Sequence, residues 1–466
     1  MPQTGETLSP QLGIQLERVP RGYYTPGDTI CGTVDRKAPL VTPRARVAIT
    51  LHGRSKSKIK ISQQTSSGSN AYYRDNFTFF SPSATTVVLF DGPLHVEAGG
   101  DQAAWPFAVT IPTSTRVPCI ARQRSGGRTE LNEEGRLLPG SFYFSYSGFA
   151  TEIMAFVEYY LEATMRIYSN NASRPPVAIL PVSIRCAPDP RPPIADFALQ
   201  RQFTQGPHKF QSHRLVPDQE DVKPSSSQKI KRFFHSSKVP SLTVMFEFEA
   251  PGVIQLEHPI PVPLLFRAVP VWEHTSEAIR NIPQKIRLSY VSLKISSQTT
   301  ASAPGTFREH SASEKDTTYF VTLGSRAGGD PIYLPFSTKD PPLDIGELLN
   351  LRIGYIGYGG SIGRRATYFY SSGRICPAFR TSNINHFGHR LKWTVRVSLC
   401  GETEEISGSR PVRILPPSCD LPPGEPEAPP PLLESQTTES WAEPPPEKGA
   451  PPPYRPAEGE QGQSSA

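Results

Sequence analysis

The residues that most clearly define a chemistry stand near the C-terminus, where three prolines precede a tyrosine, Pro451-Pro452-Pro453-Tyr454. Consecutive prolines hold the backbone in an extended polyproline II helix, so an aromatic-lined groove can bind it with little loss of chain entropy. Pro451, Pro452 and Tyr454 fit the pattern Pro-Pro-x-Tyr, in which the tyrosine fills a neighbouring pocket. The motif predicts a docking peptide for a WW domain. A chance match in a proline-rich segment is the alternative.

The segment around this motif differs in composition from the rest of the chain. Residues 420–466 contain 13 prolines and nine acidic residues against two basic ones, which gives them a net charge of −7. Few apolar side chains remain to offset the entropy lost on ordering, so this tail is expected to be disordered. Because the whole chain carries +6, residues 1–419 carry +13. A basic body attracts acidic partners, whether anionic lipids, phosphorylated peptides, nucleic acid or acidic receptor tails.

One basic cluster in the body is a candidate binding site. Arg54, Lys56, Lys58 and Lys60 alternate with uncharged residues, so a strand would carry all four on one face. There they could contact the acidic tail of a partner or an anionic lipid. The alternative is a solvated edge strand that uses lysines to block unwanted pairing.

A second basic cluster lies in the polar, serine-rich stretch of the chain. Lys229 and Lys231 stand close after Ser225, Ser226 and Ser227. They could form a ligand patch in a linker or accept ubiquitin. A plain solvated linker is the alternative.

Motifs for catalysis or metal binding lack the context that they need. Residues 359–363 match the nucleophile-elbow pattern G-x-S-x-G, but the residues after them predict a strand where the elbow requires a helix. His386 and His389 are three residues apart without a third ligand, which favours structural histidines. No enzyme activity, metal or cofactor is expected.

Apolar residues recur at every second position in the body, which predicts strands rather than helices. Residues 157–167 predict a long strand with one face buried, and residues 390–399 a second one, followed by a turn at Gly401-Glu402 and a return strand toward 411–415. Near Lys285 the apolar phase shifts between Tyr290 and Val291, as in a bulged strand. Shorter alternating runs lie at 47–51, 77–79, 107–111, 142–144 and 244–248. Many short strands with Pro and Gly turns indicate two tandem antiparallel β-sandwiches, an all-β fold.

Nothing in the sequence predicts secretion or membrane insertion. It has no run of 18 apolar residues, and the N-terminus lacks a charged segment followed by an apolar one. The six cysteines are far apart and form no C-x-x-C pair, which favours reduced thiols. A cytoplasmic protein is expected.

The residues from Tyr24 to Val34, with the sequence YTPGDTICGTV, resemble the opening of arrestin-like N-terminal domains. In this segment Pro26-Gly27 would turn the chain, Asp28 would accept hydrogen bonds from turn amides, and Ile30 would enter the core together with Val34. Later motifs look like the same family in the same order: residues 105–107, 111–112, 138–142 and 157–163, and, less closely, 260–271 and 389–393. The terminal Pro-Pro-x-Tyr is similar to that of fungal alpha-arrestins.

The resemblance implies the following organisation: a flexible N-terminus at 1–11, an arrestin-like β-sandwich at 12–190, a connector at 191–239, a second arrestin-like β-sandwich at 240–418, and a disordered acidic tail at 419–466. It also implies an adaptor. Alpha-arrestins recruit WW-domain HECT-type ubiquitin ligases through Pro-Pro-x-Tyr, here Pro451, Pro452 and Tyr454, while the body selects membrane transporters or receptors for ubiquitination and endocytosis. Such a protein is cytoplasmic, is recruited to the plasma membrane or endosomes, and can associate peripherally with membranes.

Two other functions fit parts of the sequence. A cargo-sorting scaffold of the retromer kind shares the arrestin fold and recruits no ligase. A β-rich DNA-binding regulator would also combine a basic body with an acidic proline-rich tail, but the chain has no recognisable reading helix or zinc motif, so no nucleic acid is expected as a partner.

Overall fold

The structure, a computed structural model, describes residues 4–18, 23–62, 70–115, 121–122, 128–129, 137–168, 174–217, 239–305, 309–323, 331–354, 366–367 and 375–419. These residues belong to one compact unit, Met1–Pro423. The Pro-Pro-x-Tyr motif, the rest of the predicted tail from residue 420 on, Lys229, Lys231 and the G-x-S-x-G motif all lie outside the described residues.

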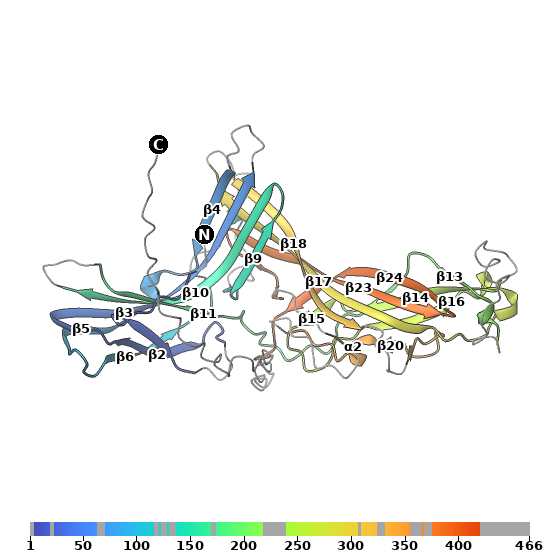
Figure 1. Cartoon of the computed structure of the whole chain (residues 1–466), viewed down its shortest axis with the longest axis horizontal. Coiled ribbons are helices and arrows are strands. Elements are labelled where there is room, and N and C mark those ends of the chain that lie inside the picture. Colours follow the sequence, from blue (N-terminus) through green and yellow to red (C-terminus); the bar gives the residue numbers. More distant parts are fainter. Residues whose placement is uncertain are drawn as a thin grey trace, which may run out of the picture. The chain divides into compact units, whose positions relative to one another are not determined.

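The described chain is all-β, as predicted (Figure 1). Its strands up to the middle of the chain are β1 (Gly13–Leu16), β2 (Thr29–Arg36), β3 (Leu40–Ser62), β4 (Asn70–Thr78), β5 (Thr86–Val96), β6 (Ala103–Thr110), β7 (Ala121–Arg122), β8 (Arg128–Thr129), β9 (Phe142–Ser147), β10 (Thr151–Ile167), β11 (Val177–Val182), β12 (Gln200–Phe203) and β13 (His208–Gln211). The later strands are β14 (Ser241–Ala250), β15 (Val253–Gln255), β16 (Leu265–Pro270), β17 (Arg287–Pro304), β18 (Glu309–Leu323), β19 (Ile332–Tyr333), β20 (Leu343–Asp344), β21 (Ala366–Thr367), β22 (Phe379–Arg380), β23 (Ile384–Leu399), β24 (Glu402–Pro411) and β25 (Arg413–Leu415). The helical elements are short: the 3₁₀ turns Pro82–Ala84, His213–Leu215, Trp272–His274 and Glu277–Ile279, and α2 (Ile345–Leu348).

Each sheet in the described part of the chain takes its strands either from residues 13–182 or from residues 200–415. In the first group, β1, β2 and β6 form one sheet, and β11, β10, β3 and β4 form another, to which β5 and β9 add. In the second group, β17 and β23 form the centre of a large sheet, and β14 and β16 the centre of a smaller one. The domain boundaries stay a prediction.

The longest strand, β3, changes its partner halfway. Its first part pairs with β5 and its second with β4, while β10 pairs with it on the other side from Ala45 to Ile61. The change falls next to Gly53, where a Cβ would stand 2.7 Å from the ring of Tyr159 and 2.8 Å from that of Phe80. Both rings are buried, and the Tyr159 hydroxyl donates to the Pro139 carbonyl at 2.6 Å. A glycine is required there because two aromatic rings fill the space of a side chain.

The turn before β2 has the geometry expected from its sequence. Gly27 has φ = +94°, a conformation that L side chains rarely adopt. The carboxylate of Asp28 accepts hydrogen bonds from the Thr25 amide at 2.7 Å and from its hydroxyl at 2.9 Å. Ile30 and Val34 are fully buried. The predicted roles of these residues are therefore confirmed.

Other local predictions are confirmed or corrected by the register. The short alternating runs fall on strands, except that Phe79 and Ile111 lie one residue beyond the ends of β4 and β6. The register of β17 against β23 shifts between Leu288 and Tyr290, just before the expected position between Tyr290 and Val291. The hairpin turn after β23 consists of Cys400 and Gly401, both with positive φ, rather than Gly401-Glu402, because Leu399 pairs with Glu402.

Three features of the chain differ from expectation. β10 is buried on both faces between Phe156 and Leu161, because Thr4 and basic side chains of β3 cover the face that carries Glu158. The connector contains β12 and β13, which pair with β14; β12 is exposed along its whole length and so has no apolar alternation to reveal it. Residues 4–11, expected to be flexible, bond to the sheets, for example between Thr7 and Ile179.

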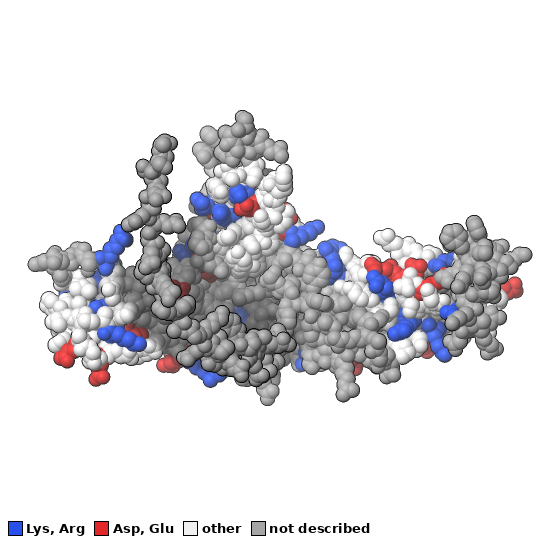
Figure 2. All heavy atoms as spheres, viewed as in Figure 1, with Lys and Arg blue, Asp and Glu red and all other residues white. Residues whose placement is uncertain are grey.

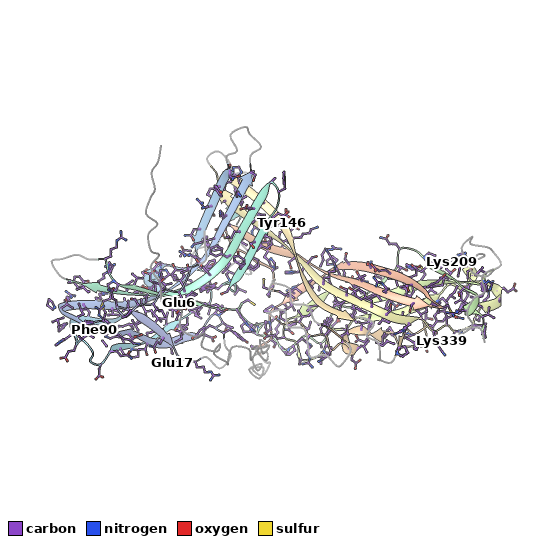
Figure 3. All side chains as sticks on the ribbon, in the orientation of Figure 1. Glu6, Glu17, Phe90, Tyr146, Lys209 and Lys339 are labelled. Carbon is purple, nitrogen blue, oxygen red and sulfur yellow. The ribbon has the colours of Figure 1, made fainter. Side chains whose placement is uncertain are left out.

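The core is one continuous apolar cluster that draws on both groups of sheets. In the first group the ring of Phe90, labelled in Figure 3, packs on that of Trp105 with centroids 5.9 Å apart. In the second, Phe248 stacks on Trp393 at 4.9 Å. Figure 1 shows β3, β4 and β10 beside β17, and these strands are in contact.

We expect Gly32→Ala to lower the free energy of unfolding by about 1–3 kcal/mol, because a Cβ at this site would overlap the Gln15 carbonyl of β1 and lie 2.8 Å from the Phe107 ring of β6. Urea unfolding measures the loss. Gly206→Ala is the matched control, since a Cβ there meets nothing within 4 Å. Equal stability of the two variants would contradict the close contact of Gly32 with β1 and with the Phe107 ring.

Candidate functional site

The four basic residues predicted to share a face of one strand do so. Arg54, Lys56, Lys58 and Lys60 occupy alternate positions in the second half of β3. Across β10 they stand opposite residues 158, 156, 154 and 152, and across β4 opposite residues 78, 76, 74 and 72. β3 is therefore an interior strand. The alternative of a solvated edge strand is wrong, because both edges of β3 carry hydrogen-bonded partners.

At the end of this face that carries Arg54 and Lys56, a buried ionic cluster surrounds Glu158. The carboxylate of Glu158 accepts from Arg54 Nε at 2.7 Å and lies 3.1 Å from Lys56 Nζ. It also accepts from the amide of Thr4 at 2.7 Å and from its hydroxyl at 2.9 Å. Lys56 keeps only 9% of its surface exposed. Arg54 and Lys56 are therefore committed to holding the N-terminal segment onto the sheet.

The surroundings of Glu158 stabilise its charged form. Burial by itself raises the pKa of this carboxyl, but the hydrogen bonds from Thr4, Arg54 and Lys56 together outweigh burial and hold the pKa below its ordinary value. Two cations and two neutral donors thus surround the Glu158 carboxylate and satisfy its hydrogen-bonding capacity. Without them the carboxylate could not remain charged at this depth.

At the end of this face that carries Lys58 and Lys60, only Lys60 has a carboxylate partner among the described residues. Lys60 bonds to Glu152 at 2.6 Å, and this bond raises the pKa of the lysine. Lys58 and Arg74 stand directly opposite each other on β3 and β4, and both lie near the ring of Tyr72, with the charged groups 5.2 and 5.5 Å from its centroid. Within the part of the chain that the structure describes, neither has a carboxylate partner.

Two cations placed opposite each other across strands repel, and an anion between them removes that repulsion. Lys58 and Arg74, both close to the Tyr72 ring, can therefore hold a carboxylate or phosphate group at the surface. Figure 2 shows lysines and arginines, with an acidic residue among them, over the part of the surface where β3 and β4 run in Figure 1. Of the four predicted residues, Lys58 is the one left available for an acidic partner.

Sequence reasoning missed Glu158, Thr4 and Arg74. Glu158 was visible as a polar position in a predicted strand, whereas Arg74 lies just before the predicted run at 77–79. Their meeting with β3 depends on the registers Arg54↔Glu158 and Lys58↔Arg74. Local periodicity contains no information on such registers.

The opposite face of β3 joins the two groups of sheets. Ser55 donates to the side-chain oxygen of Asn383 at 2.6 Å, and Asn383 returns a bond to the Ser55 carbonyl at 3.3 Å. Ser57 donates to the carbonyl of Ser302 on β17, also at 2.6 Å. Because these groups are buried, their bonds fix the position of β3 on the β17–β23 sheet.

His386 and His389, predicted to be structural, are buried on β23. His386 packs against Phe142 of β9, with ring centroids 4.9 Å apart, and its Nδ1 is 2.9 Å from the Thr299 hydroxyl. His389 Nδ1 is 2.8 Å from the Ser297 hydroxyl. Burial lowers the pKa of His386 to about 3, with a smaller contribution from His389, and that of His389 to about 4. Both rings are therefore neutral at physiological pH.

Neither a metal site nor a membrane span emerges from the described residues. No three of their His, Cys, Asp and Glu side chains are grouped closely enough to hold a metal ion. None of their helices has the length and apolar character needed to cross a bilayer. A comparison with protein-family models finds no match, and no curated protein is significantly similar to the chain in sequence.

We expect Glu158→Gln to lower the free energy of unfolding by about 3 kcal/mol at pH 7, because it leaves Arg54 and Lys56 buried without their anion. Glu152→Gln removes a carboxylate that is 42% exposed and should cost about 1 kcal/mol or less. Urea unfolding of both variants measures the contrast. Because the pKa of Glu158 is lower in the folded state, wild type should lose its advantage over Glu158→Gln as the pH falls below about 4.3. A pH-independent difference would contradict the assignment.

The two buried histidines predict that stability decreases on acidification, and that this decrease begins at a higher pH than the decrease caused by protonation of Glu158. Their pKa values are lowered on folding, so below about pH 6.5 the unfolded state binds more protons and unfolding becomes easier. Between pH 6 and pH 4, His389→Gln should remove up to about 1.4 kcal/mol per pH unit from the slope of unfolding free energy. Exposed His95→Gln is the control. An unchanged slope in His389→Gln would show that this ring is not buried in its neutral form.

Proposed function

We propose that this protein is an adaptor of the arrestin-like kind that recruits a WW-domain HECT-type ubiquitin ligase to membrane transporters or receptors. The observation that carries the proposal is the motif Pro451-Pro452-Pro453-Tyr454 in a proline-rich acidic segment beside an all-β body. A polyproline II peptide is a ready ligand for an aromatic groove, whatever the fold to which it is attached.

The proposed arrestin-like character of the body rests on the residues from Tyr24 to Val34. The turn of Thr25 to Asp28 and the burial of Ile30 and Val34 support it, since these are the roles that the resemblance assigns to the segment. The all-β architecture, built from two groups of antiparallel sheets, supports it as well.

In this proposal the body selects the cargo by charge. Lys58 and Arg74 offer a surface site for an acidic segment of a transporter or receptor, with the ring of Tyr72 close to both. Residues 1–419 carry a net charge of +13, which also favours peripheral association with an anionic membrane. The protein would then act from the cytoplasm, at the plasma membrane or endosomes. A monomer with one motif can occupy only one WW domain at a time and gains no avidity from tandem WW domains. Recruitment of the ligase would therefore be weak or assisted by oligomerisation.

Tyr454→Ala in the full-length chain should abolish binding to purified WW domains of HECT-type ligases, because the motif loses the side chain that fills the second pocket. Pro453→Ala is the matched control and should bind like wild type, since Pro453 is the variable position of the motif. Fluorescence anisotropy with labelled WW domains measures both. Equal binding by Tyr454→Ala and wild type would rule out this recruitment mechanism.

Proximity labelling in cells separates the two proposed roles of the chain. Tyr454→Ala should lose the ligase and keep the membrane cargo, whereas Lys58→Glu combined with Arg74→Glu should keep the ligase and lose the cargo. Cargo retained without any ligase in wild type would favour a sorting scaffold of the retromer kind. Salt-sensitive binding of duplex DNA by the body would favour a nucleic-acid regulator.

A further inference from the structure

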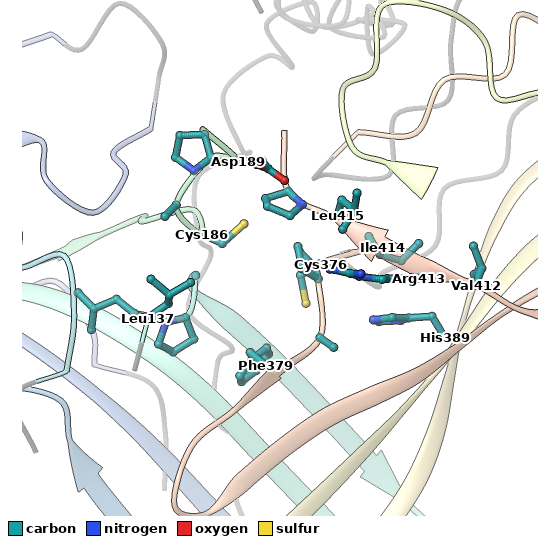
Figure 4. Close-up of a pocket in the computed structure, with 18 of the residues that line it drawn as sticks. Leu137, Cys186, Asp189, Cys376, Phe379, His389, Val412, Arg413, Ile414 and Leu415 are labelled. Carbon is teal, nitrogen blue, oxygen red and sulfur yellow. The ribbon is translucent and has the colours of Figure 1, made fainter. Parts of the chain in front are cut away.

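A pocket of about 890 Å³ lies where the two groups of sheets approach each other, within the unit Met1–Pro423 (Figure 4). Its walls come from residues 137–140 and 186–191 on one side and from residues 376–379 and 411–416 on the other. Its size lies within the range of about 300–1,000 Å³ that small-molecule sites occupy.

The walls of the pocket are apolar and poor in hydrogen-bond donors. Six prolines line it: Pro139, Pro188, Pro190, Pro377, Pro411 and Pro416. Proline has no backbone N–H and a fixed φ, so these walls are stiff and offer fewer donors than other residues would. Leu138, Val412 and Ile414 add buried aliphatic surface. A ligand in this pocket must therefore be mainly hydrocarbon.

Charge in the pocket is concentrated on one arginine. Asp189 is held by two side-chain bonds from Arg191, at 2.8 and 2.9 Å, and these are the main cause of its lowered pKa. Arg413, on β25, contributes to that lowering but makes no side-chain hydrogen bond or ion pair with any described residue. In Figure 4 its side chain extends into the pocket toward Cys376.

The other polar side chains among the described lining residues are neutral. Burial raises the pKa of the Cys186 thiol to about 12, and His389 is uncharged because burial lowers its pKa to about 4. With Asp189 and Arg191 compensating each other, Arg413 gives the described lining residues a net charge of +1. The side chain of Arg413 is exposed, so a bound anion would stay partly in water while its apolar part is buried.

We propose that this pocket binds a small amphipathic carboxylate, such as a fatty acid, with its chain between the proline walls and its carboxylate on Arg413. An extended peptide fits less well, because its backbone amides would find few partners on walls that are lined by prolines, and each unsatisfied amide is costly when buried. An alkyl chain needs no partners, and each buried CH₂ contributes about 0.8 kcal/mol.

Isothermal titration calorimetry of the full-length protein with monomeric sodium dodecanoate tests the proposal. Wild type should bind dodecanoate at least about tenfold more tightly than dodecan-1-ol, which has the same chain and no charge. Arg413→Ala should reduce dodecanoate affinity to that of the alcohol. Arg166→Ala, an exposed arginine of β10 outside the pocket, is the matched control and should bind like wild type.

A second variant tests the place of binding independently of charge. Ala378 lines the pocket and is exposed, so Ala378→Trp fills the space without disturbing the core and should abolish binding of both ligands. Wild-type affinity in Ala378→Trp would place any binding elsewhere and overturn the proposal. Equal affinity for acid and alcohol, or no heat of binding with either, would overturn it as well.

Discussion

The antiparallel pairing of β3 with β10 is the constraint on which the rest of the structure depends. All residues of β10, from Thr151 to Ile167, pair with residues of β3. This one register puts Glu158 opposite Arg54, aligns the basic face, and presents Ser55 and Ser57 to the second group of sheets. A shift by one residue would turn every side chain of β3 to the other face. The basic face and the joint with β17 and β23 would then be lost together.

Polar contacts, rather than apolar ones alone, specify how the two groups of sheets meet. Apolar packing is tolerant of small displacements, whereas a buried hydrogen bond is lost when its partners separate. The bonds between Ser55 and Asn383, together with the packing of His386 against Phe142, therefore fix the arrangement of the two groups of sheets. The same arrangement creates the proline-lined pocket, because its walls come from both groups. A ligand there would contact both and would stabilise this arrangement over others.

The proposed partners of this protein are recognised by different physical means. The Pro-Pro-x-Tyr motif is recognised as a short extended peptide, and its affinity depends on little beyond its own residues. The basic face offers two cations whose repulsion an anion relieves, which favours any acidic group of suitable size. The pocket combines a hydrocarbon volume with one cation and is more selective, since a ligand must satisfy both. An adaptor with these three features would join an enzyme, a charged target and a lipid-like molecule.

Local sequence determined the strands with alternating apolar residues, the turn of Thr25 to Asp28 and the shared face of Arg54 to Lys60, because each depends on neighbours within a few residues. It also indicated a bulge in β17, close to the observed shift between Leu288 and Tyr290. It also determined the all-β class, through its period of two. Tertiary structure alone decided that Lys56 is neutralised by Glu158, 102 positions away, while Lys58 stays available beside Arg74. It also decided that Arg413 points into a pocket built from residues 137–191 and 376–416, which are far apart in the sequence. Strand register and the approach of distant loops follow from the packing of the whole chain, and a local pattern contains no information on either.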